Sequence, residues 1–244
     1  MAGPLPPDAR GEGISWNWPG IHPDGRKFLV AAACVAALAL WLAPAWIAWP
    51  LVGLTLWMAM FFRDPVRAVP QDNRIIISPA DGLVTLIRTV MPPLEMQGEG
   101  GLTSDYCTRV SIFMSVFDVH INRAPIGGTV NMVAHIGGAF RNAGDDAASE
   151  VNERQHYVFV RPDGLRVGMT QIAGLVARRI IGFVKIGDIV APGQRIGLIR
   201  FGSRVDVYLP PDTAARVAIG QRCIAGETIL GFIADTSSAS AVRQ

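Results

Sequence analysis

The longest uncharged stretch of the sequence does most to restrict its fold. Residues 28–62 carry no acidic or basic side chain and are mostly apolar. A single crossing of a bilayer takes only about 20 residues, so this stretch is too long for one span. Pro44 and Pro50 divide it, which predicts two short apolar helices. The segment from Trp46 to Trp49, between the prolines, is expected to form a turn at the membrane interface, where indole rings are favoured.

Basic residues flank this stretch on both sides. Arg26 and Lys27 precede it, and Arg63 and Arg67 follow it. Because positive side chains near membrane spans stay on the cytoplasmic side, both ends of a membrane-anchoring helical hairpin are predicted to lie there, with the following domain on the cytoplasmic face of the cell membrane. The alternative is a helical pair buried in a soluble domain, which apolar surface on all sides of both helices disfavours.

Composition limits the remaining possibilities. The 244 residues leave room for the hairpin and one domain of ordinary size, and with 50% apolar and only 17% charged residues the chain favours contact with lipid. A net charge of +2, without basic runs interleaved with aromatic residues, argues against a nucleic-acid partner. The three cysteines form no C-x-x-C pair, so no zinc ribbon or redox motif is predicted, and no metal site.

After Pro70 the pattern changes to short β-rich runs separated by Gly, Pro and Asp turns. We therefore predict an α+β protein, in which a β-rich catalytic domain with hammerhead-like or barrel-like strands follows the N-terminal apolar helical hairpin. The runs that predict strands are residues 74–77, 83–87, 109–113 and 157–160. The expected divisions are a flexible segment at 1–27, the hairpin at 28–62, the domain at 63–235 and a disordered tail at 236–244.

The segment before Ser203 suggests chemistry. Two turn pairs, Gly187-Asp188 and Pro192-Gly193, separate short β runs, which places Phe201-Gly202-Ser203 at the end of a strand. Glycine offers an unhindered carbonyl and unusual backbone angles, so the hydroxyl of Ser203 could attack the Gly202 carbonyl in an N-to-O acyl shift. A Gly-Ser pair by itself is more often an ordinary turn, so the neighbouring sequence must decide.

Five sequence blocks, in this order along the chain, resemble those of one enzyme family, the short-form phosphatidylserine decarboxylases. The resemblance extends from about residue 61 to 209 and includes the apolar anchor. The blocks are Phe61-Phe-Arg-Asp-Pro65, Ser78-Pro-Ala-Asp-Gly82, Phe117-Asp-Val-His-Ile-Asn-Arg-Ala-Pro125, Asn152-Glu-Arg154 and Phe201-Gly-Ser203.

The resemblance implies a self-cleaving proenzyme. Cleavage between Gly202 and Ser203 would give chains 1–202 and 203–244, which stay associated, and would convert Ser203 into a pyruvoyl group, the covalent cofactor. The pyruvoyl ketone would form a Schiff base with the amine of phosphatidylserine in the membrane, and loss of carbon dioxide would give phosphatidylethanolamine. A homo-oligomer is compatible with the sequence.

Activation of Ser203 requires a base, usually a histidine oriented by a carboxylate. His120 and Asp81 are the candidates, although Asp81 could equally form a turn ahead of Gly82. In the long-form bacterial enzymes a second histidine, regarded as the base, occupies the position of Arg123. The base is therefore left open between His120 and His135.

Further polar residues are candidates for binding the substrate. The guanidinium of Arg123 offers a planar fork for a lipid phosphate or carboxylate, and His135 is a second substrate-binding candidate. Arg178 and Arg179 are expected to be surface charges that attract anionic lipid.

Two other function classes compete with this interpretation. The turns around Gly187-Asp188 also resemble those of a biotinyl or lipoyl carrier, but Lys185 precedes the turn within an apolar run and lacks the exposed setting of a modified lysine. A membrane protein without catalysis is the second alternative. Self-cleavage at Ser203 distinguishes both from a decarboxylase.

Overall fold

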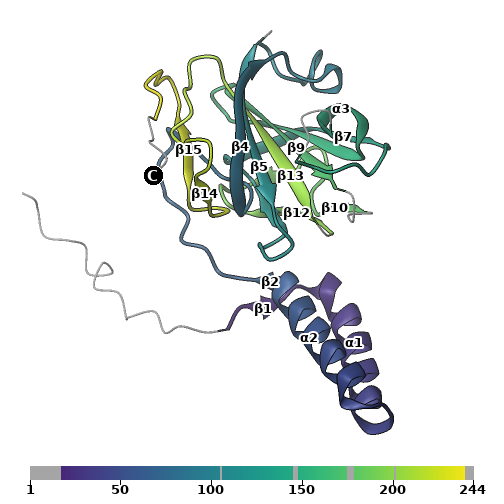
Figure 1. Ribbon diagram of the computed structural model, residues 1–244. Helices are drawn as coiled ribbons and strands as arrows, with labels where there is room; N and C mark the ends of the chain where they lie inside the picture. The colour runs from purple at the N-terminus through teal and green to yellow at the C-terminus, as the bar shows by residue number, and fades with distance from the viewer. Residues whose placement is uncertain (1–17, 105, 145–147, 175–178, 201, 240–244) are drawn as a thin grey trace, which may run out of the picture.

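The computed structural model describes residues 18–104, 106–144, 148–174, 179–200 and 202–239. Its N-terminal part is a pair of antiparallel helices, α1 (Pro23–Leu42) and α2 (Ala45–Phe61), which pack side by side and project from one end of a β-rich domain (Figure 1). Two short strands, β1 (Gly20–Ile21) and β2 (Arg63–Asp64), pair where the hairpin meets the domain. The predicted helical hairpin is thus confirmed.

The turn of the hairpin differs from the expected one. Residues 46–49 are helical, so the predicted interfacial turn there is wrong, and the chain reverses at Ala43 and Pro44 instead. Pro50 lies inside α2. A proline in a helix removes one backbone hydrogen bond, but apolar helices in membranes tolerate it because the neighbouring turn adjusts.

The helices carry their apolar side chains on the outside. Trp41 and Trp46 are 81% and 75% exposed, and most large side chains of both helices are open in the same way. Among the described residues, α1 is long and apolar enough to cross a bilayer, and α2 is a shorter apolar helix. Exposed apolar surface of this extent needs lipid or another apolar partner.

The domain is built on one curled eight-stranded antiparallel sheet, whose strand order is β11-β7-β8-β9-β13-β5-β4-β14 (Figure 1). A three-stranded sheet, β10-β12-β6, and a pair, β15-β3, complete the domain. The α+β, β-rich class is therefore confirmed. The strands are β3 (Ile75–Ile77), β4 (Gly82–Val90), β5 (Cys107–Met114), β6 (Ile121–Arg123), β7 (Gly128–Ile136), β8 (Arg154–Val160), β9 (Arg166–Ala173), β10 (Ile180–Gly182), β11 (Ile189–Val190), β12 (Arg195–Ile199), β13 (Ser203–Leu209), β14 (Arg222–Cys223) and β15 (Ile229–Phe232), with short helices η2 (Leu94–Met96) and α3 (Ala148–Val151).

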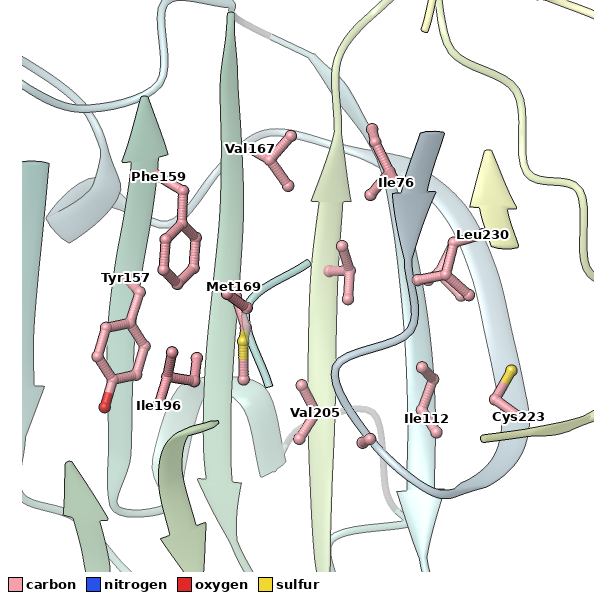
Figure 2. Packing of buried hydrophobic residues seen from close by; sticks show 14 of the residues in the cluster. Ile76, Ile112, Tyr157, Phe159, Val167, Met169, Ile196, Val205, Cys223 and Leu230 are labelled. Carbon is pink, nitrogen blue, oxygen red and sulfur yellow. The ribbon is translucent and has the colours of Figure 1, made fainter. Parts of the chain in front are cut away.

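The hydrophobic core fills the concave side of the large sheet (Figure 2). Alternate residues of β8 and β13, such as Tyr157, Phe159 and Val205, point into it, as the two-residue period of a strand requires. Ile196 on β12 and Leu230 on β15 close it from the other side. A smaller cluster around Phe61 and Phe62 joins the end of α2 to the domain. The anchor is therefore packed onto the domain where the chain enters it.

Candidate active site

Ser203 is the first residue of the central strand β13. The sequence pattern had predicted that it lies at the end of a strand. It pairs with Met114 on β5 on one side and with Ala173 on β9 on the other. The side chain is fully buried, and its hydroxyl donates to the Met114 sulfur at 3.4 Å. Sulfur is a weak acceptor, so the backbone at Ser203 is fixed while the hydroxyl is only lightly held.

Gly202 has a backbone conformation that is accessible mainly to glycine. Its φ is +56°, a left-handed conformation that disfavours side chains. Its carbonyl oxygen lies directly over Gly174, where a Cβ atom would be only 2.1 Å from that oxygen. Gly174, which follows β9, and Gly202, which precedes β13, thus allow the two backbone segments to approach closely beside Ser203. Phe201, the third member of this block, lies outside the described residues.

Replacing Gly174 by alanine is expected to slow self-cleavage roughly tenfold or more, because the new methyl must displace the Gly202 carbonyl, and each 1.4 kcal/mol added to a barrier is about a tenfold loss in rate. The rate is measured as the appearance of the smaller chain on a gel during synthesis in vitro. Gly137→Ala is the matched control, since no atom lies within 4 Å of the added Cβ at that position. Cleavage of Gly174→Ala at the parent rate would contradict this role.

His120 lies in the interior next to the anchor. Its ring packs against Phe61 at a tilt of 31°, with centroids 4.2 Å apart, and its side chain is fully buried. Nδ1 lies 2.9 Å from the Asp118 carbonyl oxygen, which can only accept, so Nδ1 carries the proton. Nε2 is buried and has no hydrogen-bond partner among the described residues. Nε2 therefore holds a lone pair that could take a proton.

Position along the chain brings His120 toward Ser203. The backbone carbonyl of His120 accepts from Ile199 at 3.3 Å, just before the segment that leads to Ser203. Met114, which contacts Ser203, ends β5, and the loop that follows it leads to His120. His120 is thus connected to the surroundings of Ser203 through β12 and through the end of β5.

The pKa of His120 is lowered to about 4, mainly because burial disfavours the charged ring. His156, also buried, has a pKa lowered to about 4 for the same reason. Below pH 6.5 these histidines become protonated in the unfolded chain but stay neutral in the folded chain. The free energy of unfolding therefore decreases as the pH falls from 6.5 toward 4. We expect each histidine to contribute up to about 3 kcal/mol to this loss.

The check is thermal unfolding of the detergent-solubilised protein across this pH range. His120→Gln should reduce the acid-induced fall in melting temperature, and His156→Gln should do the same by a similar amount. An unchanged pH dependence in both variants would show that neither histidine is held neutral by the fold.

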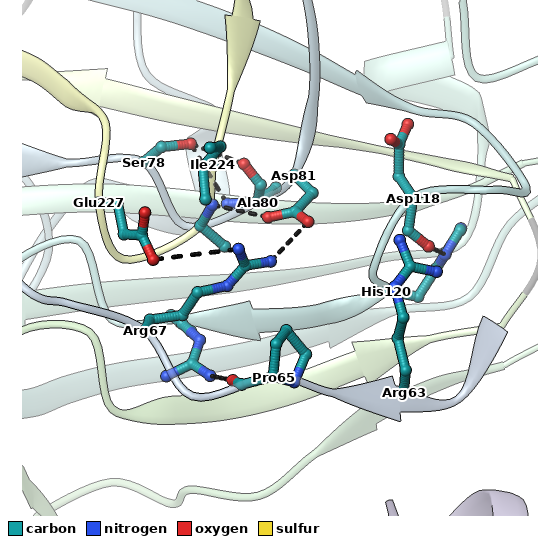
Figure 3. A network of polar contacts seen from close by, with 12 residues as sticks. Arg63, Pro65, Arg67, Ser78, Ala80, Asp81, Asp118, His120, Ile224 and Glu227 are labelled. Atoms are coloured by element: carbon teal, nitrogen blue, oxygen red, sulfur yellow. Dashed lines mark hydrogen bonds and ion pairs between the residues drawn. The ribbon is translucent and has the colours of Figure 1, made fainter. Parts of the chain in front are cut away.

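Asp81 is bonded to residues other than His120 (Figure 3). Its carboxylate accepts from Arg67 at 2.6 Å and from the backbone N–H of Ala225 at 2.7 Å. The expected pairing of Asp81 with His120 is therefore not formed, and a backbone carbonyl orients His120 instead. Asp81 joins the segment after the anchor to the part of the chain beyond Ser203.

Arg123 is buried and its donors are used inside the protein. One nitrogen donates to the Gly193 carbonyl at 2.9 Å, and another donates to the Pro65 carbonyl at 2.9 Å and lies 3.7 Å from an Asp64 oxygen. Two carbonyls and a carboxylate thus take the place of the substrate group expected there. This arrangement joins the sequence block at residues 61–65 to the block at residues 117–125.

His135 lies at the exposed end of β7, with its side chain 52% exposed. Its Nε2 is 3.9 Å from a Glu153 carboxylate oxygen. Glu153 is bonded through its backbone carbonyl to Ala173, the strand neighbour of Ser203. The structure therefore contains a pair of a histidine and a carboxylate, His135 with Glu153, next to the strand neighbour of Ser203. The sequence had assigned no role to Glu153.

A buried chain of polar side chains, not expected from the sequence, also reaches Ser203. Gln155 donates to Tyr157 at 2.6 Å, Tyr157 donates to Gln171 at 3.1 Å, and Gln171 donates to Asn122 at 2.7 Å. Asn122 in turn lies 3.5 Å from the sulfur of Met114, which contacts the serine. Asn122 belongs to one of the conspicuous blocks, which was its only signal in the sequence.

An apolar helical hairpin joined to a β-rich domain with a buried serine after a left-handed glycine fits the class of membrane-associated proenzymes. Comparison with known proteins gives the family. The family model described as phosphatidylserine decarboxylase matches residues 54–231. The chain belongs to the phosphatidylserine decarboxylase family, as the sequence blocks had indicated.

Similar proteins carry the name phosphatidylserine decarboxylase proenzyme. One from Novosphingobium aromaticivorans is 56% identical over 97% of this chain and 96% of its own length. One from Zymomonas mobilis is 56% identical over 91% of this chain and 90% of its own. One from Ruegeria pomeroyi is 48% identical over 86% of this chain and 94% of its own.

Proposed function

We infer that the chain is a carboxy-lyase that converts phosphatidylserine to phosphatidylethanolamine by means of a pyruvoyl group made from Ser203. The observation that carries this function is the fully buried Ser203 directly after the left-handed Gly202, in a chain 56% identical to a relative named as a decarboxylase proenzyme. The carrier alternative has no support from the family match, and the inactive alternative is addressed by the cleavage experiment below.

The self-cleavage chemistry starts at the serine hydroxyl. Oγ attacks the Gly202 carbonyl carbon, and the acyl group moves from nitrogen to oxygen, so that an ester replaces the peptide bond. Removal of the Ser203 α-proton then expels Gly202 as a carboxylate and leaves dehydroalanine. Addition of water and loss of ammonia give the pyruvoyl group at the start of the chain 203–244.

The residues around Ser203 fit this group. A pyruvoyl group is of similar size to serine and occupies the first position of β13, where the remaining residues stay paired with β5 and β9. When formed, its conjugated carbonyl accepts the electron pair that is released as carbon dioxide leaves. The fully buried surroundings of Ser203 exclude water from that position.

His120 is proposed as the group that accepts and returns protons near Ser203. Its support is the Nε2 lone pair, which has no partner among the described residues and which a pKa of about 4 leaves unprotonated at neutral pH. His135 with Glu153 is the second candidate, supported by the 3.9 Å contact between them. Asp81 is proposed as a positioning residue, through Arg67 and Ala225, and Arg123 as a residue that holds the anchor segment.

The two chains stay together after cleavage. The chain 203–244 contributes β13 to the centre of the large sheet, and its Arg222 is paired with Asp118 of the chain 1–202. Assembly of several copies into a homo-oligomer stays a prediction, which light scattering in detergent checks.

The protein is membrane-associated through its hairpin. We propose that the hairpin crosses the membrane and that the domain lies on the cytoplasmic side, because the basic residues Arg26, Lys27, Arg63 and Arg67 all lie at the domain end of the helices. The divisions at residues 27, 62 and 235 also remain proposals, and parts of the outer two segments, 1–17 and 240–244, lie outside the described residues. Labelling of single cysteines placed in the hairpin turn, in intact cells, tests the orientation.

One experiment tests the function. The purified protein should run as two chains, 1–202 and 203–244, and mass spectrometry of the smaller chain should find a pyruvoyl group in place of an amino terminus. The same preparation should release carbon dioxide from carboxyl-labelled phosphatidylserine. An intact chain with full decarboxylase activity, or a smaller chain with an ordinary Ser203 amino terminus, would contradict the proposal.

A further inference from the structure

A cavity of about 390 Å³ lies where the hairpin meets the β-rich domain. It is formed by the first turns of α1, by β10 and by the residue after β12. The residues that line it are Asp24, Lys27, Arg179, Ile180, Ile181, Gly182 and Arg200. It is separate from Arg123, to which the sequence had assigned the substrate head group.

The charged side chains of this cavity are three cations and one carboxylate. Within the described ranges, no acidic group lies within 4.0 Å of the charged nitrogens of Lys27, Arg179 or Arg200, and Asp24 is paired with His22 at 3.3 Å. The Nε of Arg200 is buried and has no hydrogen-bond acceptor within the part of the chain that the structure describes. A buried N–H without a partner is costly, so the site is suited to an anion that supplies the missing acceptors.

Phe28 lies between two of the cations. The Arg200 guanidinium carbon is 5.0 Å and the Lys27 Nζ is 5.3 Å from the centre of its ring. Contacts of cations with an aromatic face are favourable and restrict where the charges can move. The aromatic ring of Phe28 thus restrains both charges next to the cavity.

The position of the cavity matches the geometry of a phospholipid. Lys27 lies at the domain end of α1, where the apolar helix leaves the protein, so the cavity is at the level expected for lipid head groups. Arg200 is three residues before Ser203, which places their Cα atoms at most about 11 Å apart. In phosphatidylserine the phosphodiester separates the acyl chains from the amine that must reach the group at residue 203.

We propose that this cavity binds the phosphodiester of phosphatidylserine and holds the substrate's amine toward Ser203. Lys27, Arg179 and Arg200 bind the anionic oxygens, and the acyl chains extend along the exposed apolar surface of the hairpin. This assignment rests on the proposed function, because it places the head group relative to the residue that becomes the pyruvoyl group.

The test is the double variant Lys27→Gln with Arg179→Gln, assayed on phosphatidylserine in micelles of an uncharged detergent. Self-cleavage should be complete, kcat should stay within about twofold, and KM should rise roughly tenfold or more, as expected when charge-assisted hydrogen bonds to an anion are lost. Arg179→Lys should retain most of the affinity. Arg74→Gln, which removes an exposed arginine paired with Asp72, is the matched control and should leave KM unchanged.

Soluble competitors distinguish the sources of the anion. Glycerophosphoglycerol, a phosphodiester without an amine, should compete with the substrate in the parent and lose most of its effect in the double variant. Equal competition by inorganic phosphate would identify a free-phosphate site and overturn the assignment. An unchanged KM in a double variant that is fully cleaved and active would overturn it as well, whereas a parent that releases no carbon dioxide would refute the proposed function itself.

Discussion

Replacing Ser203 by alanine is expected to leave the chain in one piece and to reduce release of carbon dioxide to background. The hydroxyl is the only nucleophile that the proposed acyl shift uses, and without the shift there is no pyruvoyl group. The fold should survive, because among the described residues the hydroxyl is hydrogen-bonded only to the Met114 sulfur, at 3.4 Å, and its removal leaves little space. Surface and small-volume changes of this kind cost about 1 kcal/mol or less.

The measurement is a gel of the purified variant together with the release of labelled carbon dioxide. Ser111→Ala is the matched control, since Ser111 is also fully buried and lies on β5, beside β13. That control should cleave and decarboxylate like the parent. If Ser203→Ala still split, or still decarboxylated phosphatidylserine, the assignment of the cleavage site would be wrong.

Arg204, the residue after Ser203, is expected to give the largest stability effect in the domain. Its side chain is 2% exposed and pairs at 3.0 Å with Asp206, which is fully buried. Arg204 also donates to the Ala143 carbonyl at 3.1 Å, and Ser149 donates to Asp206 at 3.0 Å. Removing one member of a buried pair strands the other charge, so Arg204→Ala should lower the free energy of unfolding by about 3–5 kcal/mol.

Unfolding of the uncleaved protein in detergent, in the Ser203→Ala background, measures this loss without interference from chain separation. The double replacement Arg204→Met with Asp206→Leu should recover much of the stability, because apolar side chains of similar volume often substitute for a buried ion pair. Arg74→Ala, at an exposed ion pair with Asp72, should have no measurable effect. A loss no larger than that of Arg74→Ala would show that the buried pair contributes nothing.

Local features of the fold could be predicted, and long-range ones could not. The hairpin follows from the lack of charge in residues 28–62, and the strands follow from alternating apolar residues between turns. The turn at Ala43–Pro44 was misplaced, because Pro50 was taken as a helix breaker, a rule that applies in water and is relaxed in apolar helices. The order β9-β13-β5 depends on pairing between distant segments, which no local pattern encodes.

The site divides in the same way. Gly202, Ser203 and His120 were predicted because each lies in a recognisable block of sequence. The approach of Gly174 to the Gly202 carbonyl was not, because the two glycines flank β9 and β13, which are neighbours only in the folded sheet. The partners of Asp81 were missed for the same reason, since Arg67 and Ala225 come from the two opposite ends of the domain.

The place of β13 between β9 and β5 also determines how long each molecule can work. A cofactor that diffuses in can be replaced when it is damaged, but a reactive group built into the middle strand of a sheet cannot be exchanged without unfolding the domain. Each polypeptide therefore receives its reactive group once.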